Sequence, residues 1–216
     1  MVDSASAKGF AFERRIAYVL EQIKNSLEPG WTFVIRGEQE IREHFKEQSL
    51  NGVDHMIQVR NLKGEQHLFL LQEKWRLQTN QREVSQFLDC CARILARMPD
   101  YKGEIHRMWI SRTVPSANGE KSLEEGQCIV VQTCTSQSLL AINAALVICE
   151  ILERRDLAIT LIESIGSFLP QKEEAIADPK VCPDSNPMTF EPVSDFGEKR
   201  VLPITNKTVV MVKKVG

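Results

Sequence analysis

Hydrophobic side chains recur at helical spacing in two stretches of the chain. In residues 7–25 and 79–98 they lie three or four positions apart, which predicts two amphipathic helices. Ser136 can cap a third helix over residues 136–155. Asp156 can cap a further helix that reaches about residue 169, where Pro170 ends it. The pattern in residues 79–98 is the most regular, so we expect that helix to pack on a sheet.

Runs rich in β-branched and aromatic residues lie between the predicted helices. These predicted strands are residues 31–35, 53–59, 67–75, 105–112 and 128–134. The second and third are joined by polar residues with Lys63 and Gly64 at the centre, which predicts a hairpin. Residues 38–48 fit a short helix or an ordered loop, and residues 116–126 can carry a short helix. The alternation of helices and strands predicts an α/β fold.

The end of the chain has a different character. Prolines at 170, 179, 183, 187 and 192 stand among polar residues and indicate an extended linker. Residues 200–204 and 208–215 then predict a small hairpin, which is unstable alone and must dock on this chain or on a partner. We therefore divide the chain into a main domain, residues 1–169, and a Pro-rich extended tail, residues 170–216.

Composition narrows the setting but does not indicate a function. The chain has 216 residues, 43% of them hydrophobic and 26% charged, which is ordinary for a soluble globular protein. Its net charge of -2 gives no overall basic field, so any nucleic-acid surface must be local. The longest apolar stretch falls short of the roughly 20 residues of a membrane-spanning helix, and the N-terminus lacks a signal-peptide pattern. We expect no membrane contact and a cytoplasmic or nuclear location.

Cysteine and histidine residues show no metal-ligand spacing. The six cysteines include no pair of C-x-x-C motifs, so we expect reduced and mostly buried thiols. The four histidines have no paired spacing, and we expect them to be structural or surface residues. They are His44, His55, His67 and His106.

The predicted hairpin brings three polar side chains together. Pairing about residue 63 places Asp54 opposite Gln72, and opposed side chains have Cβ atoms about 5 Å apart, close enough to share a hard cation. Lys74 shares the face of Gln72, because side chains alternate along a strand. Glu73 should point to the other face, although its backbone carbonyl can still face the metal. Asp54, Gln72 and Lys74 thus predict one polar site.

Glu13 is a fourth candidate, from the preceding helix. Phe10, Ala17 and Leu20 share its helical face, and an acid on an apolar stripe needs a partner. One interpretation is an ion pair with an arginine at the edge of the core, and the other is membership of the polar site. In the second, Glu13 would be an outer or second-metal ligand.

Together these residue types suit phosphodiester hydrolysis, which needs an activated water and positive charge for the transition state. Asp54 would be the central Mg²⁺ ligand and the Gln72 amide oxygen a neutral one. Lys74 would orient the attacking water and stabilise the phosphorane. With two carboxylates and no third, we expect weaker metal affinity than in an all-acid site, and we expect Mn²⁺ to substitute for Mg²⁺.

Three short motifs carry a resemblance to a known family. They are G-F-A-F-E at residues 9–13, N-G-V-D at residues 51–54 and L-L-Q-E-K-W at residues 70–75. The chain resembles the Mrr-type branch of the PD-(D/E)XK nucleases over about residues 7–165. In that branch glutamine replaces the usual acid of (D/E)-x-K, as in Gln72-Glu73-Lys74. Two features depart from the family: the glycine-rich approach to the aspartate is reduced to Gly52, and the chain is slightly acidic.

The resemblance implies a restriction-endonuclease-like core, with a mixed central β-sheet flanked by helices. It also implies a metal-dependent DNA endonuclease. Duplex DNA is the expected substrate, RNA and an unusual junction or modified duplex are left open, and a homodimer is left open because double-strand cutting usually uses two active sites. The alternative function is a catalytically silent module that binds nucleic acid or protein on the same fold. Trp75 is expected to pack in the core.

Arginines near the predicted site fit a phosphate-binding surface or an ordinary solvated face equally well. The first candidates for DNA contacts are Arg14, Arg76 and Arg82, and the wider set adds Arg15, Arg93 and Arg97.

Overall fold

The computed structural model describes residues 4–76, 78–113, 115–132, 136–158, 161 and 210–211. The helices of the described residues are α1 (Ser4–Ser26), α2 (Glu38–Phe45), α3 (Gln81–Ala96), α4 (Ala117–Glu125) and α5 (Gln137–Ile151). The strands are β1 (Thr32–Gly37), β2 (His55–Arg60), β3 (Gln66–Lys74), β4 (Glu104–Ser111), β5 (Ile129–Gln132) and the two-residue β6 (Val210–Met211).

The strands form one mixed sheet in the order β1-β2-β3-β4-β5-β6. The first three are antiparallel neighbours, β3, β4 and β5 run parallel, and β6 is antiparallel to β5. The parallel connections pass through α3 and α4, as crossovers between parallel strands require. The predicted α/β fold with a mixed sheet flanked by helices is therefore confirmed.

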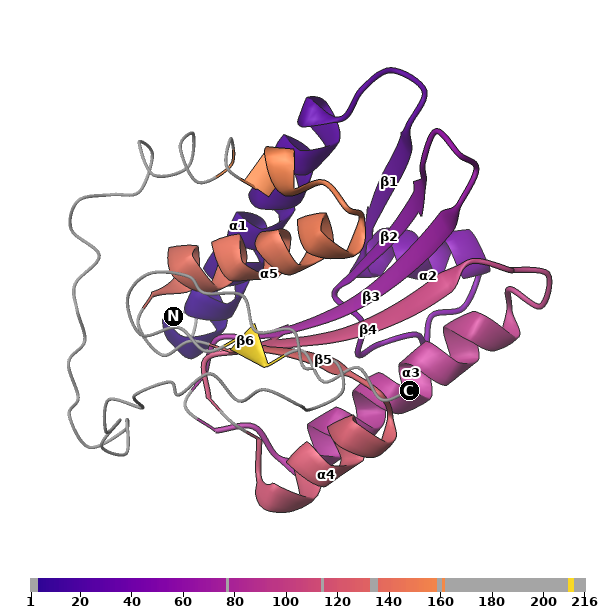
Figure 1. Ribbon diagram of the computed structural model, residues 1–216. Coiled ribbons are helices and arrows are strands. Elements are labelled where there is room, and N and C mark those ends of the chain that lie inside the picture. The colour runs from indigo at the N-terminus through magenta and orange to yellow at the C-terminus, as the bar shows by residue number, and fades with distance from the viewer. Residues whose placement is uncertain are drawn as a thin grey trace, which may run out of the picture.

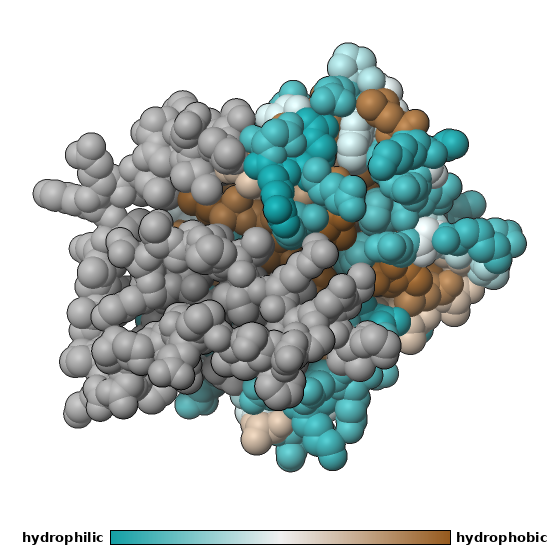
Figure 2. Space-filling view, in the orientation of Figure 1, coloured by the Kyte–Doolittle hydropathy of each residue, from teal (hydrophilic) through white to brown (hydrophobic). Residues whose placement is uncertain are grey.

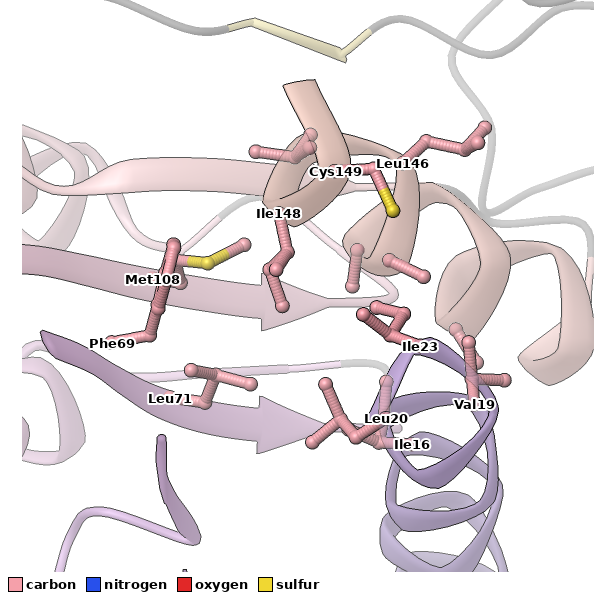
Figure 3. Close-up of a cluster of buried hydrophobic side chains, with 14 of the residues drawn as sticks. Ile16, Val19, Leu20, Ile23, Phe69, Leu71, Met108, Leu146, Ile148 and Cys149 are labelled. Carbon is pink, nitrogen blue, oxygen red and sulfur yellow. The ribbon is translucent and has the colours of Figure 1, made fainter. Parts of the chain in front are cut away.

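Helices cover both faces of this sheet (Figure 1). On one face, side chains of α1 and α5 pack together and onto β3 and β4, as the labelled residues of Figure 3 show. On the other face, α2, α3 and α4 cover a second cluster that includes Met56, Leu68, Leu70, Phe87 and Trp109. Each strand alternates between the two clusters, which is why Phe69 and Leu71 face α1 and α5 while Leu68 and Leu70 face α3.

Local capping explains where several helices begin. The side chain of Asn80 accepts a hydrogen bond from the Glu83 backbone N–H at 3.0 Å, and Asn80 donates its own N–H to the Glu83 carboxylate at 3.0 Å. This capping box starts α3. The predicted cap Ser136 accepts from the Leu139 N–H at 3.0 Å and starts α5. The undecided segment 38–48 contains the helix α2.

The end of α5 differs from the prediction. The helix stops at Ile151 and not at residue 155, because Glu153 adopts a left-handed conformation with φ 57°. The Arg154 N–H then bonds to the Cys149 carbonyl at 2.8 Å. The next helical turn already includes Arg155, so the predicted cap at Asp156 is wrong.

The tail touches the sheet through β6. Met211 lies opposite Val130, so part of the second arm of the predicted terminal hairpin pairs with β5. The other arm and the predicted linker lie outside the described residues.

Among the helices of the described part of the chain, none is both long and apolar enough to cross a membrane. Figure 2 shows the surface of the molecule in the orientation of Figure 1, where hydrophilic residues lie beside a band of hydrophobic residues.

Candidate active site

The hairpin of β2 and β3 has the predicted register. His55 lies opposite Leu71 and Arg60 opposite Gln66, so the pairing is symmetric about residue 63. The backbone N–H of Asp54, the residue just before β2, donates to the Leu71 carbonyl of β3 at 2.8 Å. Asp54 therefore stands beside the end of β3, next to Gln72, as the sequence predicts.

The Asp54 carboxylate is held by two donors from β3. Its Oδ2 accepts a hydrogen bond from the Gln72 side-chain amide and another from the Glu73 backbone N–H, the second at 2.6 Å. Gln72 is buried and Asp54 is partly buried. The donors fix the position of the carboxylate at the point where the polar residues replace the apolar row of Leu68 and Leu70.

Gly52 allows the loop before Asp54 to reach the end of β3. Its φ of 118° is a conformation that residues with a Cβ rarely adopt, and a Cβ at this position would lie 2.9 Å from the Gln86 carbonyl oxygen of α3. The loop before Asp54 can thus pass directly against the α3 backbone. The positive φ and the close approach to α3 explain why a glycine stands two residues before Asp54.

Lys74 and Glu13 act electrostatically on the same corner. Burial raises the pKa of Glu13, the negative charge of Asp54 raises it further, and the positive charge of Lys74 opposes the shift. Among the residues that the structure describes, no arginine forms an ion pair with Glu13, and His55 and Glu38 act on its pKa more weakly than Asp54 and Lys74. Phe10 is 59% exposed, however, so the predicted apolar stripe around Glu13 is wrong at this residue.

The side chain of Glu73 points to the opposite face of the sheet, as predicted, and there it contacts His55. Its carboxylate lies 2.7 Å from His55 Nδ1, and its side chain is fully buried. One carboxylate oxygen, Oε2, is buried without a hydrogen-bond partner. The diagonal pair of His55 and Glu73 follows from the register, because His55 opposes Leu71 and Glu73 is two residues further along the same face.

The pKa values of this pair are both raised. Burial favours neutral His55, but attraction to Glu73 and the hydrogen bond between them outweigh it and raise the pKa of His55 to about 9. Burial raises the pKa of Glu73 to about 7, against the opposing effect of His55. The sequence carried a signal for this pair in its hairpin symmetry, although histidine spacing alone did not reveal it.

The Glu73 backbone faces Asp54. Its N–H bonds to the Asp54 carboxylate, and in a strand the N–H and C=O of one residue leave on the same side. The carbonyl therefore leaves β3 on the side of Asp54, the arrangement expected of a metal ligand.

The arginines around the corner divide into two groups. Arg93 and Arg97 both form ion pairs with Glu47, and Arg76 pairs with Glu83 at 2.7 Å. Arg14 and Arg82 are exposed. Two members of the wider arginine set are thus engaged in a surface ion-pair network away from β3.

Trp75 packs as predicted. Its ring lies 5.7 Å from the Phe12 ring, and the Arg112 guanidinium stands 5.3 Å from its centroid. The tryptophan therefore anchors the end of β3 against α1.

A second polar group lies at the start of β3. Ligand atoms of His67, Glu104 and His106 all lie within 4.8 Å of one another, and among the described residues this is the one such group of three His, Cys, Asp or Glu side chains. His67 and His106, which the sequence analysis expects to be structural or surface residues, are brought side by side by β3 and β4. No spacing in the sequence reveals this contact, since it depends on the parallel register of two strands 39 residues apart.

Comparison of the chain with models of protein families, with curated proteins and with solved structures gives no match.

Proposed function

We propose that this chain is a metal-dependent DNA endonuclease with a restriction-endonuclease-like core, of the PD-(D/E)XK type in its Mrr-like Q-x-K form. The observation that carries the proposal is the contact of Asp54 with Gln72 at the end of the β2–β3 hairpin. Lys74 follows on the same face by strand alternation, and Glu13 approaches from α1. These are the residues that the three motifs single out.

The donor atoms fit a hard divalent cation. Asp54 offers carboxylate oxygens, Gln72 an amide oxygen and Glu73 a backbone carbonyl, and oxygen ligands are those that Mg²⁺ and Mn²⁺ prefer. The amide of Gln72 presents its nitrogen to Asp54 here, and rotation about its last side-chain bond exchanges that nitrogen for the oxygen.

Repulsion between acids favours a cation at this corner. Burial and the charge of Asp54 both raise the pKa of Glu13, so two carboxylates share a poorly solvated space. A cation between them would relieve that repulsion. Bound Mg²⁺ would polarise the scissile phosphate and lower the pKa of a water ligand.

The chain's own groups then have separate tasks. Asp54, fixed by its two donors, holds the position of the ligand set. The Lys74 ammonium donates hydrogen bonds, so it can orient an attacking water and stabilise the additional negative charge on the phosphate. Glu13 can accept a hydrogen bond from a water on the α1 side. Arg14 and Arg82 remain the exposed cations available to the DNA backbone.

The alternative is a catalytically silent module that binds nucleic acid or protein on the same fold. The observation that favours it is the saturation of Asp54 Oδ2 by two donors of the chain. Such hydrogen bonds can stabilise an aspartate that has no metal to bind.

Substrate assays separate the two functions. The full-length chain is incubated with duplex DNA, single-stranded DNA and RNA in Mg²⁺, in Mn²⁺ and with a chelator. The nuclease proposal predicts cleavage of duplex DNA that the chelator abolishes. Binding of any of these polymers without hydrolysis in either metal would favour the silent module.

A further inference from the structure

The polar group at the start of β3 lies on the face of α1 and α5, at the other end of the strand from Gln72. His67 and Gln72 are five residues apart, which is about 16 Å along a strand. Both imidazoles are mostly buried, with side-chain exposures of 11% for His67 and 13% for His106, while Glu104 is 68% exposed. The group therefore has a dry side of aromatic rings and a wet side at Glu104.

The three ligand atoms have the separations of a tetrahedral metal site. His67 Nδ1 lies 3.3 Å from His106 Nε2, and the Glu104 carboxylate oxygen lies 3.8 Å and 3.6 Å from these two nitrogens. Zinc–nitrogen bonds of about 2.0–2.1 Å at a tetrahedral angle place two nitrogens about 3.3–3.4 Å apart. The imidazole nitrogens already stand at that spacing, and the carboxylate needs only a small movement of an exposed side chain.

The fold holds both histidines in this arrangement. The parallel register places His67 beside Glu104 and Phe69 beside His106. The His106 ring stacks on Phe69 with 4.7 Å between centroids, and the two imidazoles stack at 5.5 Å. A Cβ on Gly103 would overlap the Gln66 carbonyl oxygen, so this glycine lets the start of β4 approach the start of β3.

We propose that His67, Glu104 and His106 form a Zn²⁺ site that links the first residues of β3 and β4. Two imidazoles and one carboxylate are a ligand set that suits Zn²⁺ and related transition-metal ions better than Mg²⁺. Three protein ligands leave the fourth tetrahedral position, on the side of the exposed Glu104, to water or to a group from outside. This site is chemically and spatially separate from the proposed nuclease centre, so each can fail without the other.

The test is direct Zn²⁺ binding to the tag-free, full-length chain by isothermal titration calorimetry, with Mg²⁺ as the comparison ion. We expect a single Zn²⁺ site that the double variant His67→Ala/His106→Ala weakens by more than about 100-fold. Co²⁺ provides a second readout, because a tetrahedral Co²⁺ site with nitrogen ligands absorbs visible light. That absorption should appear in the wild type and disappear in the double variant.

Two further variants distinguish a loss of Zn²⁺ ligands from a loss of folded protein. Glu104→Gln changes an exposed side chain and should weaken Zn²⁺ binding by about tenfold or more in a folded protein. His44→Ala removes an exposed histidine on α2 and should leave the affinity unchanged. If the wild type binds no Zn²⁺ at micromolar concentration, or if Glu104→Gln and the double variant bind it as tightly as the wild type, the proposed site is wrong.

Discussion

The two ends of β3 carry different ligand chemistry within one strand. The oxygen end comprises Asp54, Gln72, Lys74 and the Glu73 carbonyl, and the imidazole end comprises His67, Glu104 and His106. The oxygen end is built by an antiparallel hairpin and faces α3. The imidazole end is built by a parallel pair of strands and faces α1 and α5.

Under the two proposals, one strand would bind two kinds of cation, one at each end. At the oxygen end β3 contributes Gln72 and the residue before β2 contributes Asp54, whereas at the imidazole end β3 contributes His67 and β4 adds Glu104 and His106. Oxygen ligands select Mg²⁺ or Mn²⁺, whereas imidazoles favour Zn²⁺. We therefore expect substitutions at each end to weaken the binding of different metals.

The largest expected effect is that of Asp54→Asn on the oxygen end. Loss of the central carboxylate should reduce Mn²⁺ affinity by about a thousandfold, equivalent to about 4 kcal/mol, because the remaining ligands at this corner are neutral apart from Glu13. Calorimetric titration with Mn²⁺ measures it. Asp89→Asn, an exposed aspartate on α3, is the matched control and should bind like the wild type. Equal Mn²⁺ affinity in both variants would remove Asp54 from the ligand set.

Lys74→Met should separate catalysis from metal binding. We expect the cleavage rate to fall about 100-fold or more while Mn²⁺ affinity stays within a fewfold of the wild type, because the ammonium acts on water and phosphate and not on the metal. Single-turnover cleavage at saturating metal gives the rate. Lys121→Met on α4 is the control, since Lys121 has an exposed side chain. A normal rate in Lys74→Met would contradict the role of Lys74.

Glu73→Gln should change the pH dependence of stability. In the folded protein Glu73 holds its proton up to about pH 7 and His55 up to about pH 9, while the unfolded groups release theirs near 4.5 and 6.5. The folded state binds more protons between these values, so the free energy of unfolding falls as pH rises from about 4.5 to 9. The Glu73→Gln variant lacks the carboxyl group that binds one of these protons and whose charge helps His55 to keep the other.

We therefore expect the free energy of unfolding of Glu73→Gln to depend less on pH. Between pH 5 and 9 it should fall by about 2 kcal/mol less than the free energy of unfolding of the wild type. Urea unfolding at several pH values measures this difference. Glu120→Gln on the surface of α4 should keep the wild-type slope. The same slope in Glu73→Gln would show that the buried pair does not govern it.

The smallest effect is the exchange of Mg²⁺ for Mn²⁺. Since the oxygen end has few charged ligands, we expect Mn²⁺ to support cleavage within about tenfold of the Mg²⁺ rate and to saturate at lower concentration. Initial rates across a titration of each metal give both quantities. Cleavage that requires Zn²⁺ and is lost in His67→Ala/His106→Ala would instead assign the chemistry to the imidazole end.

The sequence predicted the oxygen end because its geometry is local. A short loop symmetric about residue 63 determines which residues of β2 and β3 are opposite, so the neighbours Asp54 and Gln72 follow from counting. The helices α1 and α3 follow from their apolar periodicity, and the predicted cap Ser136 gives the start of α5.

The imidazole end could not be predicted in this way. The register of β4 on β3 is determined by packing of the whole α3 crossover, and no short-range rule connects His67 with His106. Two other sequence predictions are also wrong. Glu153 takes a left-handed conformation that its side chain does not signal, and Phe10 is exposed although it has the spacing of a core residue.

The most direct measurement of the central claim is plasmid cleavage by the purified full-length chain and by Asp54→Ala, each in Mg²⁺, in Mn²⁺ and with a chelator. We expect the wild type to convert supercoiled DNA to nicked or linear product in either metal and not with the chelator, and we expect Asp54→Ala to leave the plasmid supercoiled. Equal cleavage by the wild type and Asp54→Ala, or no cleavage by the wild type in either metal, would contradict it.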